Sequence, residues 1–202
     1  MTRSPVNAEG THRRRRGTAQ PVAEIQFGQS MKKPIGASIR LLVVDVDGTL
    51  TDGGMYYGED GEFLKRFNTR DGAAIEYLQK KNIEIVVCTG ENSPAVRQRM
   101  IKLNIENCFM GIKHKVKYID DWLKTRHLTW QQVCYIGDEL NDKEIMQLAA
   151  ISICPSDAHP AIKKTATFEL TTKGGEGVMR EVALLLEEKN FLWKKQNIEQ
   201  RA

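Results

Sequence analysis

Two aspartates spaced one residue apart, Asp45 and Asp47, follow a run of four apolar residues at positions 41–44. A short apolar run that is closed by Asp and Gly is typical of a buried parallel strand. In open α/β sheets, ligands bind where such strands end. One carboxylate at this place can attack an electrophile and form a covalent intermediate. The second points the other way in regular strand geometry, but a turn at Gly48 would bring it back as an acid and base.

Later parts of the chain supply further polar groups that suit phosphoryl transfer. Asp138 follows another apolar run, with Glu139 and Asp142 behind it. Two or three carboxylate oxygens with water suit Mg²⁺, which usually shares them with a phosphate. Thr89 also ends an apolar run, and the backbone N–H groups after it can hold a phosphate oxygen. Lys115 could neutralise charge on a transferring phosphoryl group. These parts predict an Asp nucleophile and Mg²⁺-assisted phosphoryl transfer.

The elements that must position these residues alternate between strands and helices from Ser38 onwards. This order predicts a three-layer, Rossmann-like α/β fold with a parallel sheet covered on both faces. Two short runs around Gly58–Gly61 predict a small β-hairpin inserted after the first strand. No segment is long enough to form a separate cap domain. We expect strands at 39–46, 83–88, 107–110, 133–136, 151–154 and 167–170, and helices beginning near 71, 93, 115, 139, 158 and 177.

Charge and composition divide the chain into three parts. Residues 1–33 hold seven Lys/Arg and two acids, a charge of +5, which leaves −1 on the remainder of a chain of net charge +4. We expect a disordered basic extension at 1–37, a folded domain at 38–190 and a C-terminal tail at 191–202. The run at Arg13–Arg16 could contact nucleic acid, or belong to a solvated tail or to a segment ahead of a start at Met31. The folded domain shows no nucleic-acid footprint.

The remaining compositional evidence concerns the compartment. No apolar run approaches the roughly 20 residues needed to span a membrane, so we expect no membrane contact. The four cysteines form no Cys-x-x-Cys pair. Reduced thiols and a cytoplasmic location are therefore expected.

The chemistry-bearing residues resemble the four motifs of the haloacid dehalogenase phosphatase superfamily, in order and at sensible spacing. The resemblance implies that Asp45 is a phosphorylated nucleophile and Asp47 the general acid and base. It implies that Thr89 and Lys115 bind the phosphoryl group. It also implies that Mg²⁺ is held by Asp45, by the backbone carbonyl of Asp47 and by Asp138. The matching residues are Asp45-x-Asp47-Gly-Thr, Thr89, Lys115 and Gly137-Asp138-x-x-x-Asp142; Glu139 replaces the aspartate often found there.

Four further segments resemble the capless branch of that superfamily. This branch contains the 3-deoxy-octulosonate 8-phosphate phosphatases and the nonulosonate 9-phosphate phosphatases. The resemblance implies a 2-keto-3-deoxy sugar-acid phosphate as substrate, in lipopolysaccharide or sialic-acid-type biosynthesis. It also implies a homotetramer in which a neighbouring subunit helps to close each site. The segments are DGGMYY at 52–57, FNTRDG at 67–72, GIKHK at 111–115 and GGEG at 174–177.

Four residues are candidates for contacts with the sugar: Asn68, Glu91, Arg99 and Lys102. Octulosonate phosphatases usually carry Arg where this chain has Glu91, whereas the nonulosonate enzymes are similar to it in having Glu at 91 and Lys at 102. Glu91 could accept hydrogen bonds from sugar hydroxyls, and Arg99 or Lys102 could pair with the sugar carboxylate. The alternative is that Glu91 is solvated and that the basic residues form an exposed helix face.

Two other functions use similar residues. A receiver-type signalling module also carries a phosphorylatable Asp, an acid cluster, a Thr and a Lys, but its acceptor lies on a later strand than its acid pair. A non-catalytic partner of a cytidylyltransferase is the other alternative. In the tail, we expect Phe191, Leu192 and Trp193 to need cover and to form a subunit contact.

Overall fold

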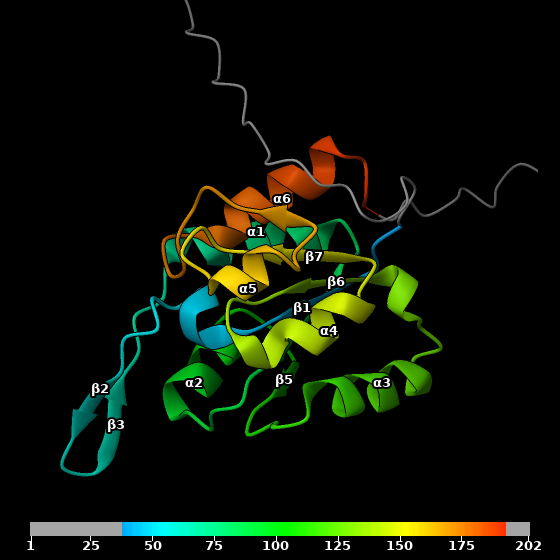
Figure 1. Cartoon of the computed structure of the whole chain (residues 1–202). Helices are drawn as coiled ribbons and strands as arrows, with labels where there is room; N and C mark the ends of the chain where they lie inside the picture. Colours follow the sequence, from blue (N-terminus) through cyan, green and yellow to red (C-terminus); the bar gives the residue numbers. More distant parts are fainter. Residues whose placement is uncertain (1–37, 193–202) are drawn as a thin grey trace, which may run out of the picture.

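The computed structural model describes residues 38–192 and contains the parallel sheet that the sequence predicts (Figure 1). The predicted extension at 1–37 and the end of the tail at 193–202 lie outside the described residues. Six strands pair in the order β5-β4-β1-β6-β7-β8, and every pairing is parallel. The strands are β1 (Leu41–Val44), β4 (Glu84–Cys88), β5 (Asn107–Phe109), β6 (Val133–Ile136), β7 (Ile151–Cys154) and β8 (Phe168–Glu169).

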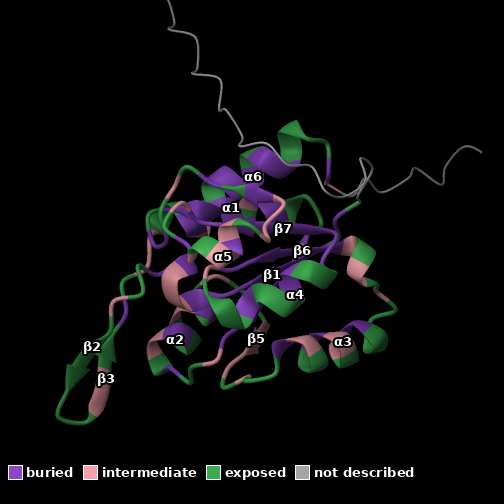
Figure 2. Cartoon of the chain, in the orientation of Figure 1, coloured by how far each residue is buried: buried purple, intermediate pink, exposed green. Residues whose placement is uncertain are grey.

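Helices cover both faces of this sheet and form the expected three layers. Leu42 and Val44 of β1 belong to one apolar cluster, and Leu41 and Val43 to the other. Both faces of the strand are therefore buried, which is why it is apolar throughout (Figure 2). The first cluster packs against α1 (Thr69–Lys80), α2 (Pro94–Lys102) and α6 (Val178–Glu188), and the second against α3 (Lys115–Thr125), α4 (Lys143–Leu148) and α5 (Pro160–Lys163).

Local capping sets where α1 and α2 begin. Helix α1 starts at Thr69, earlier than expected, because the side chain of Asn68 accepts a hydrogen bond from the backbone N–H of Arg70 at 3.0 Å. The N-cap predicted at Ser93 is confirmed, and Pro94 follows at the first helical position. The single helix expected after β6 is divided into a 3₁₀ turn at Leu140–Asp142 and α4. A second 3₁₀ turn lies at Trp130–Gln132.

The predicted hairpin is confirmed and projects from the body of the molecule (Figure 1). It consists of β2 (Tyr56–Gly58) paired antiparallel with β3 (Gly61–Leu64). No cap domain stands over the sheet within residues 38–192. None of the helices in this part of the chain has both the length and the apolar character to cross a bilayer.

The end of the described chain returns to the core. Phe191 is 8% exposed, and its ring lies 6.2 Å from that of Phe168. Its carbonyl accepts a hydrogen bond from the backbone N–H of Ile39 at 2.8 Å, and Leu192 forms an isolated parallel bridge with the same residue. The cover that we expected Phe191 to obtain from another subunit therefore comes from its own chain. Trp193 lies outside the described residues.

Candidate active site

The loops after β1, β4 and β6 line a cavity of about 290 Å³, which we call the active-site cavity. These three strands are neighbours in the sheet, so their carboxyl ends bring residues that are far apart in sequence to one edge. The predicted convergence of Asp45, Thr89 and Asp138 is therefore confirmed. The cavity is lined by Asp45, Asp47, Gly48, Gly53, Thr89, Gly90, Glu91, Asp138, Glu139 and Asn141.

The turn after β1 gives the aspartate pair its geometry. The backbone N–H of Asp45 donates to the carbonyl of Ile136 at 2.9 Å, so Asp45 is still anchored beside β6. The chain then turns at Gly48, whose φ of +81° is readily adopted only by glycine. A Cβ at Gly48 would also collide with the carboxylate of Asp138. The turn that the sequence predicted is thus present, and it packs directly against the acid from β6.

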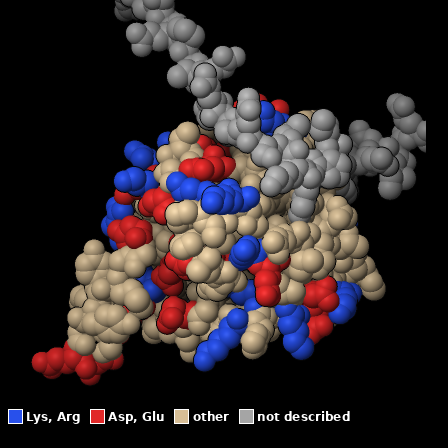
Figure 3. Space-filling model, in the orientation of Figure 1, with Lys and Arg blue, Asp and Glu red and all other residues tan. Residues whose placement is uncertain are grey.

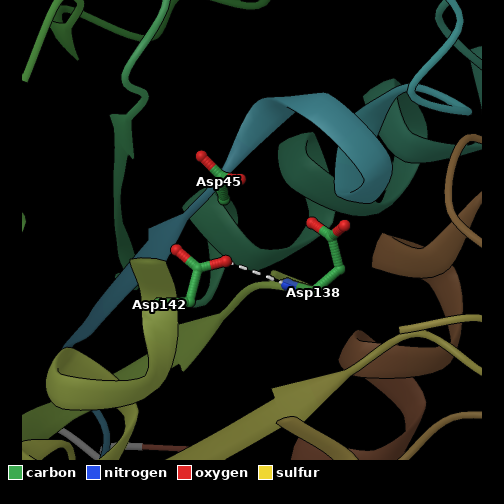
Figure 4. A group of neighbouring side chains, drawn as sticks. All are labelled: Asp45, Asp138 and Asp142. Atoms are coloured by element: carbon green, nitrogen blue, oxygen red, sulfur yellow. Dashed lines mark hydrogen bonds between the residues drawn. The ribbon is translucent and has the colours of Figure 1, made fainter. Parts of the chain in front are cut away.

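Three carboxylates form an acid cluster, which we define as Asp45, Asp138 and Asp142 (Figure 4). One oxygen from each lies within 4.8 Å of the others, a spacing that could hold a metal ion. Burial raises the pKa of Asp45 to about 7, and the charge of Asp142 adds to this rise while Lys115 opposes it. Burial and then the charge of Asp45 raise the pKa of Asp138 to about 7. Both ionised carboxylates would be stabilised by a cation placed between them.

Lys115 is the buried cation that faces this cluster. Its Nζ lies 2.8 Å from Oδ1 of Asp45 and 2.6 Å from Oδ1 of Asp142. Burial by itself would lower the pKa of Lys115, but the two carboxylates raise it above its ordinary value. The side chain is therefore a fixed ammonium group beside Asp45, which itself lines the active-site cavity.

Asp142 holds the cluster together and has little capacity left to bind a metal itself. Its Oδ2 accepts hydrogen bonds from the backbone N–H groups of Asp138 (3.0 Å) and Glu139 (3.2 Å). Its Oδ1 accepts from Lys115 and from the hydroxyl of Tyr135 at 2.5 Å. Glu139 is exposed and accepts a hydrogen bond from the adjacent backbone N–H of Leu140 at 2.7 Å. Asp45 and Asp138 are therefore better placed to serve as direct ligands.

Thr89 presents a hydroxyl at the end of β4. The side chain is buried, and its Oγ1 accepts a hydrogen bond from the backbone N–H of Glu91 at 3.2 Å. Because this bond uses a lone pair of the oxygen, the hydroxyl proton is left to donate to a ligand. Glu91 is exposed and lines the same cavity. The arrangement can donate to a phosphate oxygen at Thr89 and accept from a hydroxyl at Glu91.

Three of the predicted sugar contacts are not brought to the cavity by this chain. The side chain of Asn68 caps α1 and also donates to the carbonyl of Gly175 at 3.3 Å. Arg99 donates to the backbone carbonyl of Asn68 at 2.9 Å. Lys102 is the exposed last residue of α2, whose first turn is the end nearer the cavity loops. A role for these three in binding the sugar stays a prediction.

Sequence reasoning did not single out Lys65 and Tyr135. Lys65 is buried, and its Nζ lies 2.6 Å from Oδ1 of Asp47. The hydroxyl of Tyr135 touches both Asp142 and Lys115. A lysine beside a hairpin and a tyrosine within an apolar strand belong to no motif, so no signal in the sequence would have found them.

Comparison with known proteins agrees with this geometry. The family model for haloacid dehalogenase-like hydrolases matches residues 42–113 and 111–182, and the chain belongs to this family. The 3-deoxy-D-manno-octulosonate 8-phosphate phosphatase of Salmonella typhi is 38% identical over 149 residues, 74% of this chain and 79% of that protein. The resemblance read from the motifs is therefore confirmed, and the chain is an enzyme of the phosphoric monoester hydrolase class.

Solved structures give the same result. The crystal structure of the phosphatase of that name from Yersinia pestis matches with a TM-score of 0.73 and 38% identity, over 77% of this chain and 85% of that one. The phosphatase from Moraxella catarrhalis, solved in complex with a magnesium ion, a phosphate ion and a KDO molecule, matches with a TM-score of 0.72 and 29% identity, over 76% and 89% of the two chains. These matches confirm the capless, Rossmann-like fold.

Proposed function

We propose that this chain is a Mg²⁺-dependent phosphatase that removes the terminal phosphate of a 2-keto-3-deoxy sugar acid through a phospho-aspartate at Asp45. The observation that carries the proposal is the active-site cavity, where Asp45, Asp47, Thr89 and Asp138 meet. The phosphatase unit that we propose extends over the folded part of the chain, from residue 38 to about residue 190. The four cysteines are unpaired, which supports a cytoplasmic location.

The first step transfers the phosphoryl group to the enzyme. A carboxylate oxygen of Asp45 forms a bond to phosphorus, and the ester P–O bond breaks with its electron pair on the sugar oxygen. Asp47 gives a proton to that oxygen, so the sugar acid leaves as an alcohol. The Lys115 ammonium and the Thr89 hydroxyl stabilise the charge on the equatorial oxygens of the phosphoryl group.

The second step releases phosphate and restores the enzyme. Asp47, now a carboxylate, takes a proton from water as the water oxygen attacks phosphorus. The bond between phosphorus and Asp45 breaks, with its electron pair returning to the carboxylate. The products are inorganic phosphate and an enzyme in its starting state, so one water is consumed in each cycle.

The acid cluster fits a magnesium ion. Asp45 and Asp138 would hold it together with the backbone carbonyl of Asp47, because hard oxygen ligands are those that Mg²⁺ prefers. Buried, closely spaced carboxylates with pKa values raised to about 7 favour a divalent partner. When bound there, the ion neutralises negative charge on the phosphate and orients it toward Asp45. The magnesium and phosphate in the related Moraxella catarrhalis structure support this assignment.

A direct test uses Asp45→Asn, with Asp121→Asn as a matched control on the exposed face of α3. Release of phosphate from 3-deoxy-D-manno-octulosonate 8-phosphate should require Mg²⁺ and should fall by at least about a thousandfold in Asp45→Asn only. Full activity in that variant would exclude the covalent mechanism. In the unsubstituted protein, a phospho-Asp45 that forms and persists without turnover would instead favour a receiver-type module. A complete lack of phosphatase activity in the unsubstituted protein would favour a non-catalytic partner.

Two sugar acids are candidates for the natural substrate. The relatives that are 38% identical support octulosonate 8-phosphate. Glu91 lines the cavity at the position where the octulosonate enzymes usually carry Arg, which favours nonulosonate 9-phosphate. The ratio of kcat/KM for the two substrates decides between them, and Glu91→Arg should move that ratio toward octulosonate 8-phosphate. If the ratio does not change, Glu91 does not select the sugar.

The hairpin supports assembly as a homotetramer, the state that the family resemblance implies. An isolated two-stranded hairpin has little stability of its own, and its uncharged sides need cover (Figure 3). Light scattering should give the mass of four chains, and a monomer would refute this assembly. The exposed large hydrophobic residues at the hairpin are Met55 (45%), Tyr56 (48%), Tyr57 (67%), Phe63 (75%) and Leu64 (38%).

A further inference from the structure

Lys65 is a buried lysine that none of the sequence motifs contains. Its side chain has no exposed surface, although lysine is almost never fully buried unless it is paired. It follows β3 directly, and two residues later Phe67 bridges to Thr51 and closes the base of the hairpin beside the turn after β1. The ammonium group of Lys65 therefore lies near the base of the hairpin, next to Asp47.

The contact with Asp47 is asymmetric. Nζ of Lys65 lies 2.6 Å from Oδ1 of Asp47, and the hydroxyl of Thr51 reaches the same oxygen at 3.5 Å. The other oxygen, Oδ2, is shielded from solvent and has no hydrogen-bond partner within residues 38–192. Such an unsatisfied buried oxygen costs stability, and a catalytic role is one of the recognised reasons for keeping it. The carboxylate is thus held at one oxygen and left unbonded at the other.

A second carboxylate also contacts the lysine. Its Nζ also lies 3.0 Å from Oε2 of Glu62. The other oxygen of Glu62 accepts a hydrogen bond from the hydroxyl of Ser93, the residue that caps α2. Contacts from the hairpin and from α2 therefore restrict the ammonium group, and with it the rotation of the Asp47 side chain. A lysine between two carboxylates is held in its charged form.

We propose that Lys65 is a positioning residue, which holds Asp47 in the orientation from which Asp47 exchanges a proton with the leaving group. The inference rests on the proposed function, because it assumes that Asp47 is the acid of the phosphoryl-transfer step. A correctly oriented acid is worth about 10²–10⁴ in rate, and misalignment forfeits part of that factor. The loss is confined to substrates whose leaving oxygen needs a proton.

The choice of substrate separates positioning from a purely structural role. A sugar alkoxide is a poor leaving group and needs the proton from Asp47, whereas p-nitrophenolate leaves without one. The ratio kcat/KM reports steps up to the first irreversible one, here the transfer to Asp45, and excludes the later hydrolysis that both substrates share. We would measure it for octulosonate 8-phosphate and for p-nitrophenyl phosphate.

The variant is Lys65→Met, which keeps the length of the side chain and removes the charge. We expect kcat/KM to fall about 10- to 100-fold for the sugar phosphate and no more than about threefold for p-nitrophenyl phosphate. Asp47→Asn should show the same selectivity with a larger loss. Lys80→Met, on α1 and exposed in a surface pair with Glu76, is the matched control and should leave both values unchanged.

Other outcomes overturn the proposal. An equal loss for both substrates would mean that Lys65 only supports the fold, and no loss would mean that Asp47 keeps its orientation without it. If Lys65→Met does not fold, Glu62→Gln serves in its place, because it weakens the contact between Glu62 and Lys65. It should give a smaller loss of kcat/KM with the same difference between the two substrates. A wild-type enzyme that hydrolyses neither substrate would refute the proposed function instead.

Discussion

Asp142→Asn tests how much of the stability of the active site depends on one buried carboxylate. The substitution keeps the volume of the side chain but removes its charge. The native carboxylate accepts four hydrogen bonds, two from backbone N–H groups and two from Lys115 and Tyr135. An amide offers only one oxygen. Whichever way it turns, its NH₂ faces either two backbone donors or the Lys115 ammonium.

The expected loss in the free energy of unfolding follows from these lost hydrogen bonds. Removing one partner of a buried ion pair typically costs about 3–5 kcal/mol, because the remaining charge loses its compensation. Lys115 keeps Asp45 as a second partner at 2.8 Å, so we expect the lower end, about 3 kcal/mol. With a urea m-value of about 2 kcal/mol per molar, the unfolding midpoint should fall by about 1.5 M. Turnover should also fall, since Lys115 loses one of its two fixed partners.

Urea unfolding followed by tryptophan fluorescence measures this change. Two variants calibrate it: Asp121→Asn on the surface should cost less than about 0.5 kcal/mol, and Tyr135→Phe, which removes one hydrogen bond, about 1 kcal/mol. In a double-mutant cycle, Lys115→Met combined with Asp142→Asn should cost less than the sum of the two single changes by about 1 kcal/mol or more. Additive effects, or a midpoint that does not move, would refute the reasoning.

Two further predictions concern pH and the end of the chain. The pKa values of Asp45 and Asp138 are raised in the folded state from 3.8 to about 7, so the folded protein binds more protons than the unfolded one in this range. In EDTA, the free energy of unfolding should therefore fall as the pH rises from about 4 to about 7. Addition of Mg²⁺ at pH 7 should restore it. A free energy of unfolding that rises with pH over this range in EDTA would contradict the raised pKa values of Asp45 and Asp138. Phe191→Ala should cost about 3–5 kcal/mol in urea unfolding, because Phe191 packs on Phe168 in the core. If the substitution instead lowers only the mass seen by light scattering, Phe191 acts at a subunit contact.

The order of elements and the acids at strand ends could be predicted from the sequence alone. Apolar runs mark buried parallel strands, and the polar residue that follows each one must lie at the carboxyl edge of the sheet. Asp45, Thr89 and Asp138 are therefore predicted from the sequence alone to lie close together. Glycine at position 48 likewise signalled the turn, because few other residues adopt its backbone conformation.

Only the tertiary structure decided which partner each side chain takes. Arg99 donates a hydrogen bond to the backbone carbonyl of Asn68 and does not line the active-site cavity. Phe191 is buried in the core of its own chain. Lys65 meets Asp47 because the chain that leaves the hairpin returns beside the turn after β1, where Phe67 bridges to Thr51. This contact joins residues 18 positions apart. Pattern and spacing describe which face of an element a residue occupies. They do not describe the path of a loop, and the partners of buried charges depend on that path.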